Sequence, residues 1–358
     1  MTIPKNMRSL QNGTRKYWSW LNIGLSVILT ALGLWYLIRN VSLDAVGNAL
    51  SHAGIGLVAL AVLNVLSILV LKAWRWQVLF MTDATAPRLP ALFWSMALGR
   101  YVNLILPFFR LGELVRVFAL GHQHQDVRLA RALGTLAVEK TLDLITLLLT
   151  LVLALPFIVF PAVLDNLALT LGTAAAIALL TLYLLAAQTE WVIRLSGTIL
   201  TPLPDRFANW FERLITSGLQ GLSSLRSKKL VFFLFLLSLL SGILSVMTPL
   251  LLFRAFDLSL GFVEAAVIHV AVSVALTPPS TPLKIGVTHA TTAFMLDQFG
   301  VHNQASIVGY AIIYHAVTIL PLIILGGISA SRSKWQWSAF FARLQSATPS
   351  AQQEGTLY

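Results

Sequence analysis

Nine ionisable side chains lie inside or beside long apolar stretches of this sequence, where a charge is costly. At the centre of a membrane helix each charge costs at least about 2.5–3.5 kcal/mol, so such groups are expected to have ion-pair partners or a functional role. Five cations and four anions at that depth predict a hydrated cavity that binds a charged head group. The nine residues are Arg100, Arg110, Glu113, Arg116, Glu139, Lys140, Asp143, Glu264 and Lys284.

Helical spacing predicts how some of these charges pair. Glu113 precedes Arg116 by three residues, and Lys140 precedes Asp143 by three, so each pair shares a helix face. Glu139 lies four residues before Asp143 and needs a cation from another segment. The expected cations are Arg100 and Arg116. Two interpretations stay open: pairing that only holds helices together, and a cavity that takes a charged substrate.

Some polar groups at the same depth are candidates to carry coupling protons. Histidine titrates near neutral pH, which makes it the usual proton carrier. The alternative for an intramembrane histidine is a plain hydrogen bond between helices. The candidates are Glu264, His289 and His315.

Two apolar stretches, 90–120 and 261–298, are interrupted by proline and glycine. Proline removes a backbone N–H and glycine lets the chain turn, so each stretch is predicted to be a re-entrant or broken hairpin. The new half-helix then directs unpaired N–H groups into the membrane, where they favour phosphate or carboxylate. The predicted helix breaks are at Pro107, Pro278, Pro279 and Pro282.

The two breaks resemble each other. Each has proline, a basic residue, glycine and then a polar residue, with Arg110 in the first and Lys284 in the second. Their predicted entry from opposite faces indicates an inverted repeat, which in transporters places the substrate near the bilayer midplane. The predicted substrate-binding residues are Arg100, Asn103, Arg110, Gly112, Glu113, Arg116, Lys284, Gly286 and His289. The predicted pairing or coupling residues are Glu139, Lys140, Asp143, Glu264 and His315.

The rest of the chain supplies the helices that must position these groups. The sequence is 57% hydrophobic and 11% charged, against roughly a quarter charged in soluble domains, which predicts an all-α polytopic membrane protein. Six runs reach the roughly 20 residues that a span requires. They lie at 19–38, 54–73, 133–155, 167–187, 230–253 and 304–326.

Basic residues predict the orientation. With both termini cytoplasmic, 18 of the 25 Lys and Arg residues, Lys72 and Arg75 among them, fall on the cytoplasmic side and only Arg39 and Arg254 fall outside. This predicts a cytoplasmic tail at 1–17, a transmembrane domain at 18–330 and a disordered cytoplasmic tail at 331–358. Within the domain we expect halves at 18–187 and 230–330. They flank a cytoplasmic linker at 188–229 that contains an interfacial helix at 205–222.

Several function classes are disfavoured. The net charge of +11 is explained by cytoplasmic loops facing anionic lipid, so nucleic-acid binding is not expected. The chain has no cysteine, no Asp-x-Asp, no His-Glu-x-x-His and no Gly-x-Ser-x-Gly. We therefore expect no enzyme activity, no cofactor and no metal.

Short motifs in both halves resemble those of the transmembrane region of lysylphosphatidylglycerol synthases, the flippase-like domain family. The resemblance covers about residues 20–330. The motifs are Asn103 to Pro107, Gly112 to Arg116, Glu139 to Asp143, Pro282 to Val287, Tyr310 to Tyr314 and Leu320 to Ile323.

The resemblance implies movement of a phospholipid between leaflets by a stand-alone member, since about 30 residues follow the last predicted span. Three departures put specificity for a lysyl lipid in doubt. Leu283-Lys284 stands where the family usually has Gly-Gly, His289 where it has Glu, and Ala311 where it has Arg. The added Lys284 and the lost Glu make the second break more cationic, which favours an anionic head group.

We therefore expect a lipid translocase of the plasma membrane that moves an amphiphile with a charged, anionic head group. Its expected partners are membrane lipids and a lipid-modifying enzyme. Two alternatives stay open: an accessory subunit that scaffolds such an enzyme, and a transferase in a glycolipid or polyprenyl-lipid pathway. A proton-coupled transporter of small solutes is a weaker option.

Overall fold

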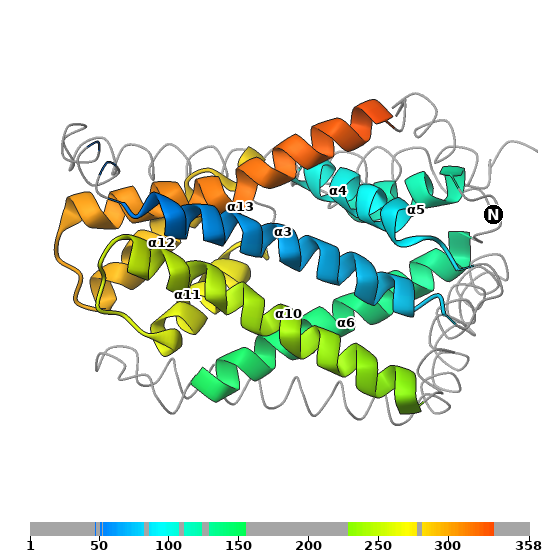
Figure 1. Ribbon diagram of the computed structural model, residues 1–358, viewed down its shortest axis with the longest axis horizontal. Helices are drawn as coiled ribbons and strands as arrows, with labels where there is room; N and C mark the ends of the chain where they lie inside the picture. The colour runs from blue at the N-terminus through cyan, green and yellow to red at the C-terminus, as the bar shows by residue number, and fades with distance from the viewer. Residues whose placement is uncertain are drawn as a thin grey trace, which may run out of the picture.

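The computed structural model describes residues 53–81, 86–106, 111–123, 129–154, 228–277 and 281–332, with residues 47 and 51. All regular elements in these ranges are helices (Figure 1). They are α3 (Ile55–Val78), α4 (Leu89–Ile105), α5 (Leu111–Gln123), α6 (Leu129–Ala154), α10 (Lys228–Ala255), α11 (Phe262–Ala275), the 3₁₀ turn η3 (Pro282–Lys284), α12 (Val287–Gln298) and α13 (Gln304–Arg332).

Helices α3, α10 and α13 are long and apolar enough to cross a bilayer, which confirms a helical, multi-pass membrane protein. They contain the spans predicted at 54–73, 230–253 and 304–326. Helix α6 covers the span predicted at 133–155, at about 39 Å for 26 residues, but it carries several charges. The spans predicted at 19–38 and 167–187, the interfacial helix, the tail at 1–17 and the tail beyond Arg332 lie outside the described residues. The tail predicted to begin at 331 starts too early, because α13 continues to Arg332.

Helices α3 and α10 form an antiparallel pair that runs along the length of the molecule (Figure 1). At one end the Gly54 N–H donates to the Ala255 carbonyl at 2.8 Å. In the middle the Asn64 side-chain amide donates to the Leu244 carbonyl at 2.7 Å. Near the other end the Arg75 guanidinium donates to the Ser238 hydroxyl at 3.1 Å. These polar contacts fix the register of two otherwise apolar helices.

The first interrupted stretch is a helical hairpin. Helices α4 and α5 pack against each other and are separated at 106–110, where the break was predicted. With 17 and 13 residues they reach only about 26 and 20 Å, which is less than the roughly 30 Å of a hydrocarbon core. Pro107 and Arg110 lie outside the described residues.

The second interrupted stretch is also a hairpin, formed by α11, η3 and α12. Helices α11 and α12 have 14 and 12 residues, or about 21 and 18 Å, so neither spans the bilayer. Leu283 and Lys284 adopt φ angles of 55° and 60°, and Gly286 follows at 84°. Three left-handed residues within four positions reverse the chain sharply. Pro278 and Pro279 lie outside the described residues, and Pro282 opens η3.

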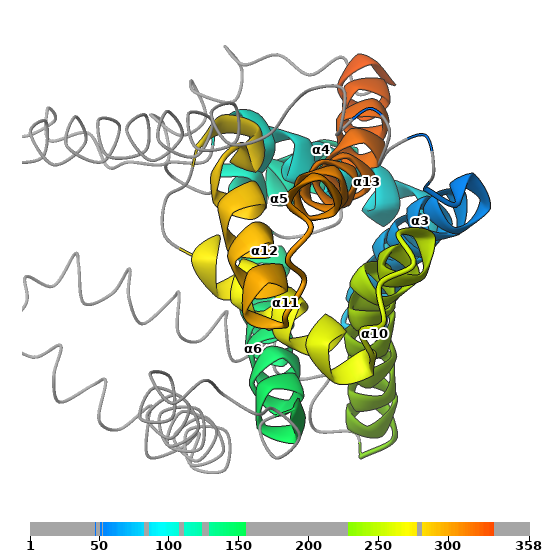
Figure 2. The same ribbon diagram turned by 90° about the vertical axis from the view of Figure 1, so that its left-hand side faces the viewer.

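The two hairpins begin at opposite ends of the α3–α10 pair. The first follows the end of α3 at Val78, and the second follows the end of α10 at Ala255, beside the start of α3. Their inner parts meet, because η3 lies against α4. Figure 2 looks along the bundle and shows α4 and α5 behind α11 and α12. This arrangement is compatible with the predicted inverted repeat, which stays a prediction.

Helix α13 joins the second hairpin to the first. Its Ser329 hydroxyl donates to the Trp94 carbonyl of α4 at 2.7 Å. A Cβ at Gly326 would lie 2.1 Å from the Tyr101 Cβ, so the helices touch where α13 has no side chain. The position of α4 is therefore set by α13 as well as by α5.

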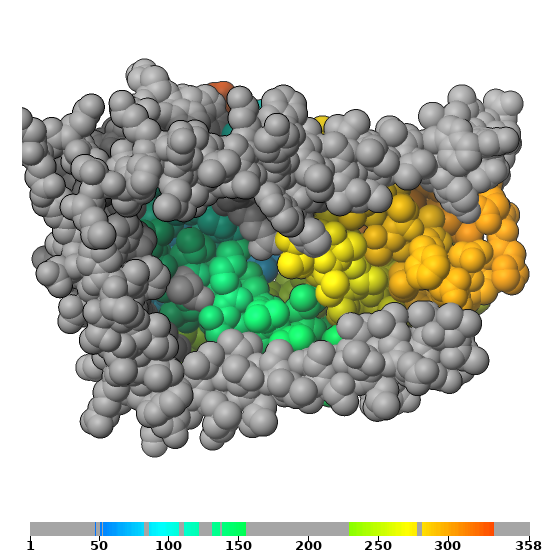
Figure 3. Space-filling view, turned by 180° about the vertical axis from the view of Figure 1, so that it is seen from behind, coloured from blue at the N-terminus to red at the C-terminus, as the bar shows by residue number. Residues whose placement is uncertain are grey.

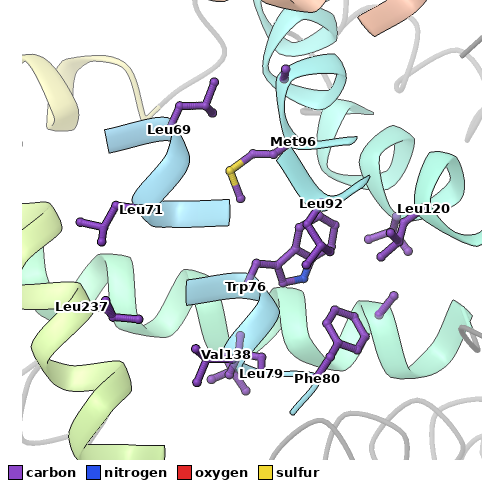
Figure 4. Packing of buried hydrophobic residues seen from close by; sticks show 14 of the residues in the cluster. Leu69, Leu71, Trp76, Leu79, Phe80, Leu92, Met96, Leu120, Val138 and Leu237 are labelled. Atoms are coloured by element: carbon purple, nitrogen blue, oxygen red, sulfur yellow. The ribbon is translucent and has the colours of Figure 1, made fainter. Parts of the chain in front are cut away.

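One of the two large hydrophobic clusters among the described residues lies around Trp76 (Figure 4). Trp76 is fully buried with Leu79, Phe80 and Leu92. Its indole N–H donates to the Thr135 hydroxyl of α6 at 3.0 Å. A tryptophan near the predicted end of a span suggests an interfacial anchor, but α3 continues to Val78 and carries Trp76 into the core.

Candidate functional site

Close glycine packing holds the first hairpin together. A Cβ at Gly112 would lie 1.8 Å from the Gly99 carbonyl oxygen, and one at Gly99 would lie 2.5 Å from the Gly112 carbonyl oxygen. Only glycine permits this backbone contact. The Gly112 N–H also donates to Asn103 Oδ1 at 2.8 Å. Asn103 thus satisfies an N–H in the first turn of α5 that the helix itself leaves unpaired.

This hairpin carries Glu113 and Arg116 to α6, where an ion cluster forms. Arg116 Nη2 lies 2.8 Å from Glu113 Oε2 and 3.0 Å from Glu139 Oε2. Lys140 Nζ lies 2.6 Å from Glu113 Oε1. Arg116 and Glu139 are almost completely buried, while the Lys140 side chain is 46% exposed. Two carboxylates and two cations from α5 and α6 therefore neutralise each other.

A second ion cluster lies next to the first along α6. Asp143 Oδ1 accepts hydrogen bonds from Lys72 Nζ at 3.0 Å and from the Arg75 guanidinium. Arg75 is fully buried. The expected Lys140–Asp143 pair is wrong, because Lys140 points to Glu113 and two cations of α3 take Asp143. Lys72 and Arg75 are also not loop residues, although the basic excess on the predicted cytoplasmic side survives their removal.

Arg100 of α4 lies among these charges. Its strongest electrostatic interactions are with Asp143 and Glu139. It forms no ion pair within 4 Å with any residue that the structure describes. With Arg100, the two clusters bring together five cations and three anions. The members are Lys72, Arg75, Arg100, Arg116, Lys140, Glu113, Glu139 and Asp143.

Some donors in this group are buried without a partner. The Nε atoms of Arg75 and Arg116 have no hydrogen-bond acceptor among the described residues. The Arg116 guanidinium also lies 4.8 Å from the centre of the Trp76 ring. The face of the ring stabilises the positive charge but gives the Arg116 N–H groups no carboxylate partner. The arrangement can thus hold an added anion more readily than an added cation.

The tip of the second hairpin carries a separate polar group. The Gly286 N–H donates to His289 Nδ1 at 3.4 Å, and His315 Nε2 lies 2.8 Å from the Leu283 carbonyl oxygen. The two imidazole rings are 4.5 Å apart. His315 of α13 therefore holds the left-handed turn in place. Both histidines act as hydrogen-bonding groups in this conformation.

Glu264 lies away from both groups. Its carboxylate accepts a hydrogen bond from the Gly261 N–H at 2.8 Å, which caps the N-terminus of α11. This contact gives Glu264 a structural role at the outer end of the second hairpin.

The structure thus places the predicted site residues in three sets. Arg100, Asn103, Gly112, Glu113, Arg116, Glu139, Lys140 and Asp143 gather where α4, α5 and α6 meet. Pro282, Lys284, Gly286, His289 and His315 gather at the second hairpin tip. Glu264 stands alone. Because Arg110 is outside the described residues, its predicted proximity to Lys284 stays a prediction.

Sequence reasoning missed two members of the site, Lys72 and Arg75. The available signal was their spacing of three residues at the end of an apolar run, which places both on one face of a helix. It also missed His269 of α11, which interacts electrostatically with Lys72. Among the described residues, no group of three or more histidine and acidic side chains is arranged to hold a metal ion.

Comparison with known families agrees with this architecture. Residues 22–326 match the lysylphosphatidylglycerol synthase TM region. The chain belongs to this family. The synthase TM-region match covers both hairpins, helices α3, α6 and α10, α13 as far as Gly326, and both polar groups. No curated protein matches the chain. Membership in the lysylphosphatidylglycerol synthase TM family suggests a function related to membrane lipids.

Proposed function

We propose that this protein moves an amphiphile with an anionic head group between the leaflets of the plasma membrane, with both termini in the cytoplasm. The observation that carries the proposal is the excess of cations in this partly buried site. Five basic and three acidic groups meet there, and Arg100 forms no ion pair with a described residue. A phosphate-bearing head group would supply the missing negative charge.

Electrostatics at membrane depth support an anionic substrate over a lysyl one. Removing a carboxylate or guanidinium from water costs several kcal/mol unless a partner compensates it. The ion pairs of this site compensate most of that cost. The groups left least compensated are Arg100 and the unpaired Nε atoms of Arg75 and Arg116. A cationic lysyl head group would add to this positive excess, whereas a phosphate would reduce it.

The two hairpins suggest how access could alternate. They begin at opposite ends of the α3–α10 pair and meet where η3 lies against α4. If the two hairpins separated on one side of the membrane and stayed in contact on the other, the charged site would open to one leaflet at a time. In this mechanism the head group crosses between the hairpins and the acyl chains stay in lipid. The protein performs no chemical step, and a lipid-modifying enzyme would supply or consume the substrate.

The test is a lipid-movement assay with purified protein in liposomes. Fluorescent phosphatidylglycerol and phosphatidylcholine report movement through the loss of signal when a reductant bleaches the outer leaflet. Arg100→Gln is the test variant. Arg332→Gln is the matched control, because Arg332 packs on Trp94 at the exposed end of α13, away from the ion clusters.

We expect Arg100→Gln to slow the anionic lipid about tenfold, equivalent to about 1.4 kcal/mol, and Arg332→Gln to leave the rate unchanged. Both variants must elute as the wild type does on size exclusion. Movement no faster than in protein-free liposomes, or equal rates for wild type and Arg100→Gln, would overturn the proposal.

A further inference from the structure

An apolar groove runs along the bundle between α6, α10 and α11. Its volume is about 290 Å³, near the lower end of the roughly 300–1,000 Å³ typical of small-molecule sites. Figure 3 shows α6 and α11 side by side on this face of the molecule. The residues that define the groove are Thr146, Thr150 and Leu153 of α6, Gly242 and Ile243 of α10, and Phe262 of α11.

The walls of the groove offer nothing that could hold a head group. The hydroxyls of Thr146 and Thr150 each donate to the carbonyl four residues earlier, at 2.8 Å. At Gly242 the Thr146 methyl group comes so close that an added Cβ would lie 2.6 Å from it. Thr146 therefore presents its methyl group, and the Thr150 hydroxyl already donates its proton within α6, so a polar ligand would lose its hydration with little to replace it.

The groove starts beside the charged site. Thr146 follows Asp143 by one helical turn, and Asp143 binds Lys72 and Arg75. From there α6 runs to Ala154 at the start of α11, where Leu153 and Phe262 are 59% and 49% exposed. A molecule lying in the groove would have one end at the ion clusters and the other at an apolar, open rim.

We propose that this groove binds one acyl chain of the lipid whose head group occupies the charged site. The inference rests on the proposed function for the identity of the head group. The chain lies with its carboxyl end near Thr146 and Gly242 and its methyl end near Leu153 and Phe262. The size of the groove suits a single chain, so the second chain of a phospholipid stays in the bilayer.

An acyl chain is the occupant that the surroundings favour. An empty apolar groove forfeits the dispersion contacts of its lining, and water does not fill apolar cavities. Helix α10, which forms one wall, is a candidate membrane span, so hydrocarbon is the solvent at this depth. The opening between Leu153 and Phe262 gives that hydrocarbon a path into the groove.

Photo-crosslinking in nanodiscs tests the inference. Two phosphatidylglycerols carry a diazirine on one chain, one near the carboxyl end and one near the methyl end, and adducts are mapped by peptide mass spectrometry. We expect the first probe to label the part of the groove around Thr146 and Gly242. We expect the second to label the part around Leu153 and Phe262.

Thr150→Trp fills the groove and should lower labelling there about tenfold. Leu144→Trp is the control, because Leu144 lies on the same helix, is 43% exposed and does not line the groove. Val263→Trp, from α11, replaces Thr150→Trp if that variant does not fold.

Equal labelling of groove residues and of exposed Leu60 and Leu63 on α3, or reversed order of the two probes, would overturn the inference. The assay needs no lipid movement, so its outcome is separate from that of the liposome assay. Ordered labelling without lipid movement contradicts only the proposed transport. Uniform labelling with Arg100-dependent movement contradicts only the acyl-chain site.

Discussion

Gly112→Ala should disrupt the first hairpin and with it the charged site. The added Cβ would lie 1.8 Å from the Gly99 carbonyl oxygen and 2.6 Å from the Asn103 side chain. An ordinary contact needs about 3.4 Å, so α4 and α5 must separate by about 1.6 Å. The first obstacle is backbone, and the second, the Asn103 side-chain amide, can move only by giving up the hydrogen bond that it accepts from the Gly112 N–H.

The size of the effect follows from three contributions. Overpacking a well-packed contact costs about 1–3 kcal/mol. The weakened Asn103–Gly112 hydrogen bond adds about 0.5–1.5 kcal/mol. Replacing glycine by alanine within a helix returns about 1 kcal/mol. The net loss is about 0.5–3.5 kcal/mol, or roughly 1–7 °C in Tm at about 2 °C per kcal/mol for a large chain.

The measurement is thermal unfolding in detergent, followed by size exclusion, for Gly112→Ala and two control variants. Gly56→Ala on α3 and Gly327→Ala on α13 add the same methyl group where no atom lies within 4 Å. We expect the controls to keep or raise the Tm, and Gly112→Ala to lower it and to slow anionic lipid movement. A Gly112→Ala protein as stable as the controls would refute the close glycine packing and the positioning that depends on it.

Two further predictions concern the ion cluster and the helix caps. Arg116→Gln leaves Glu113 and Glu139 without their shared cation and should destabilise the protein by about 3–5 kcal/mol. Adding Glu139→Gln should recover part of that loss in chemical unfolding, and additive losses would contradict coupling between the two. Asn303→Ala removes the acceptor for the Ala305 and Ser306 N–H groups at the start of α13. It should cost about 1 kcal/mol in the same assay, and an unchanged midpoint would show that the cap is not needed.

Local sequence signals predicted the two breaks because the responsible residues are adjacent in the chain. Gly112 and Gly286 lie at the first turns of α5 and α12, and Pro282 opens the turn between α11 and α12. Such signals depend only on residue type, because proline and glycine restrict or widen the backbone conformations at their own positions. The left-handed Leu283 and Lys284 were not foreseeable, since their conformation is held by His315 from a distant helix.

The pairing of charges was only partly predictable. The Glu113–Arg116 pair is three residues apart on one helix, and the structure contains it. Asp143 instead binds Lys72 and Arg75, which are 71 and 68 residues away. Helical spacing carries no information about contacts between helices. The count of basic residues also placed these two cations on the cytoplasmic side, at the end of the span predicted at 54–73.

The burial of Arg75 has a consequence for how the protein is made. The 68 residues between Arg75 and Asp143 take roughly 3 to 14 seconds to synthesise at about 5–20 residues per second. During that delay α3 has left the ribosome while its counterion does not yet exist. Until then the long side chain of Arg75 can extend to the lipid head groups and keep its charge in a polar environment. Arrival of α6 then draws Arg75 inward, so a nascent chain stopped before Asp143 should present an exposed pair of cations to quality-control proteases.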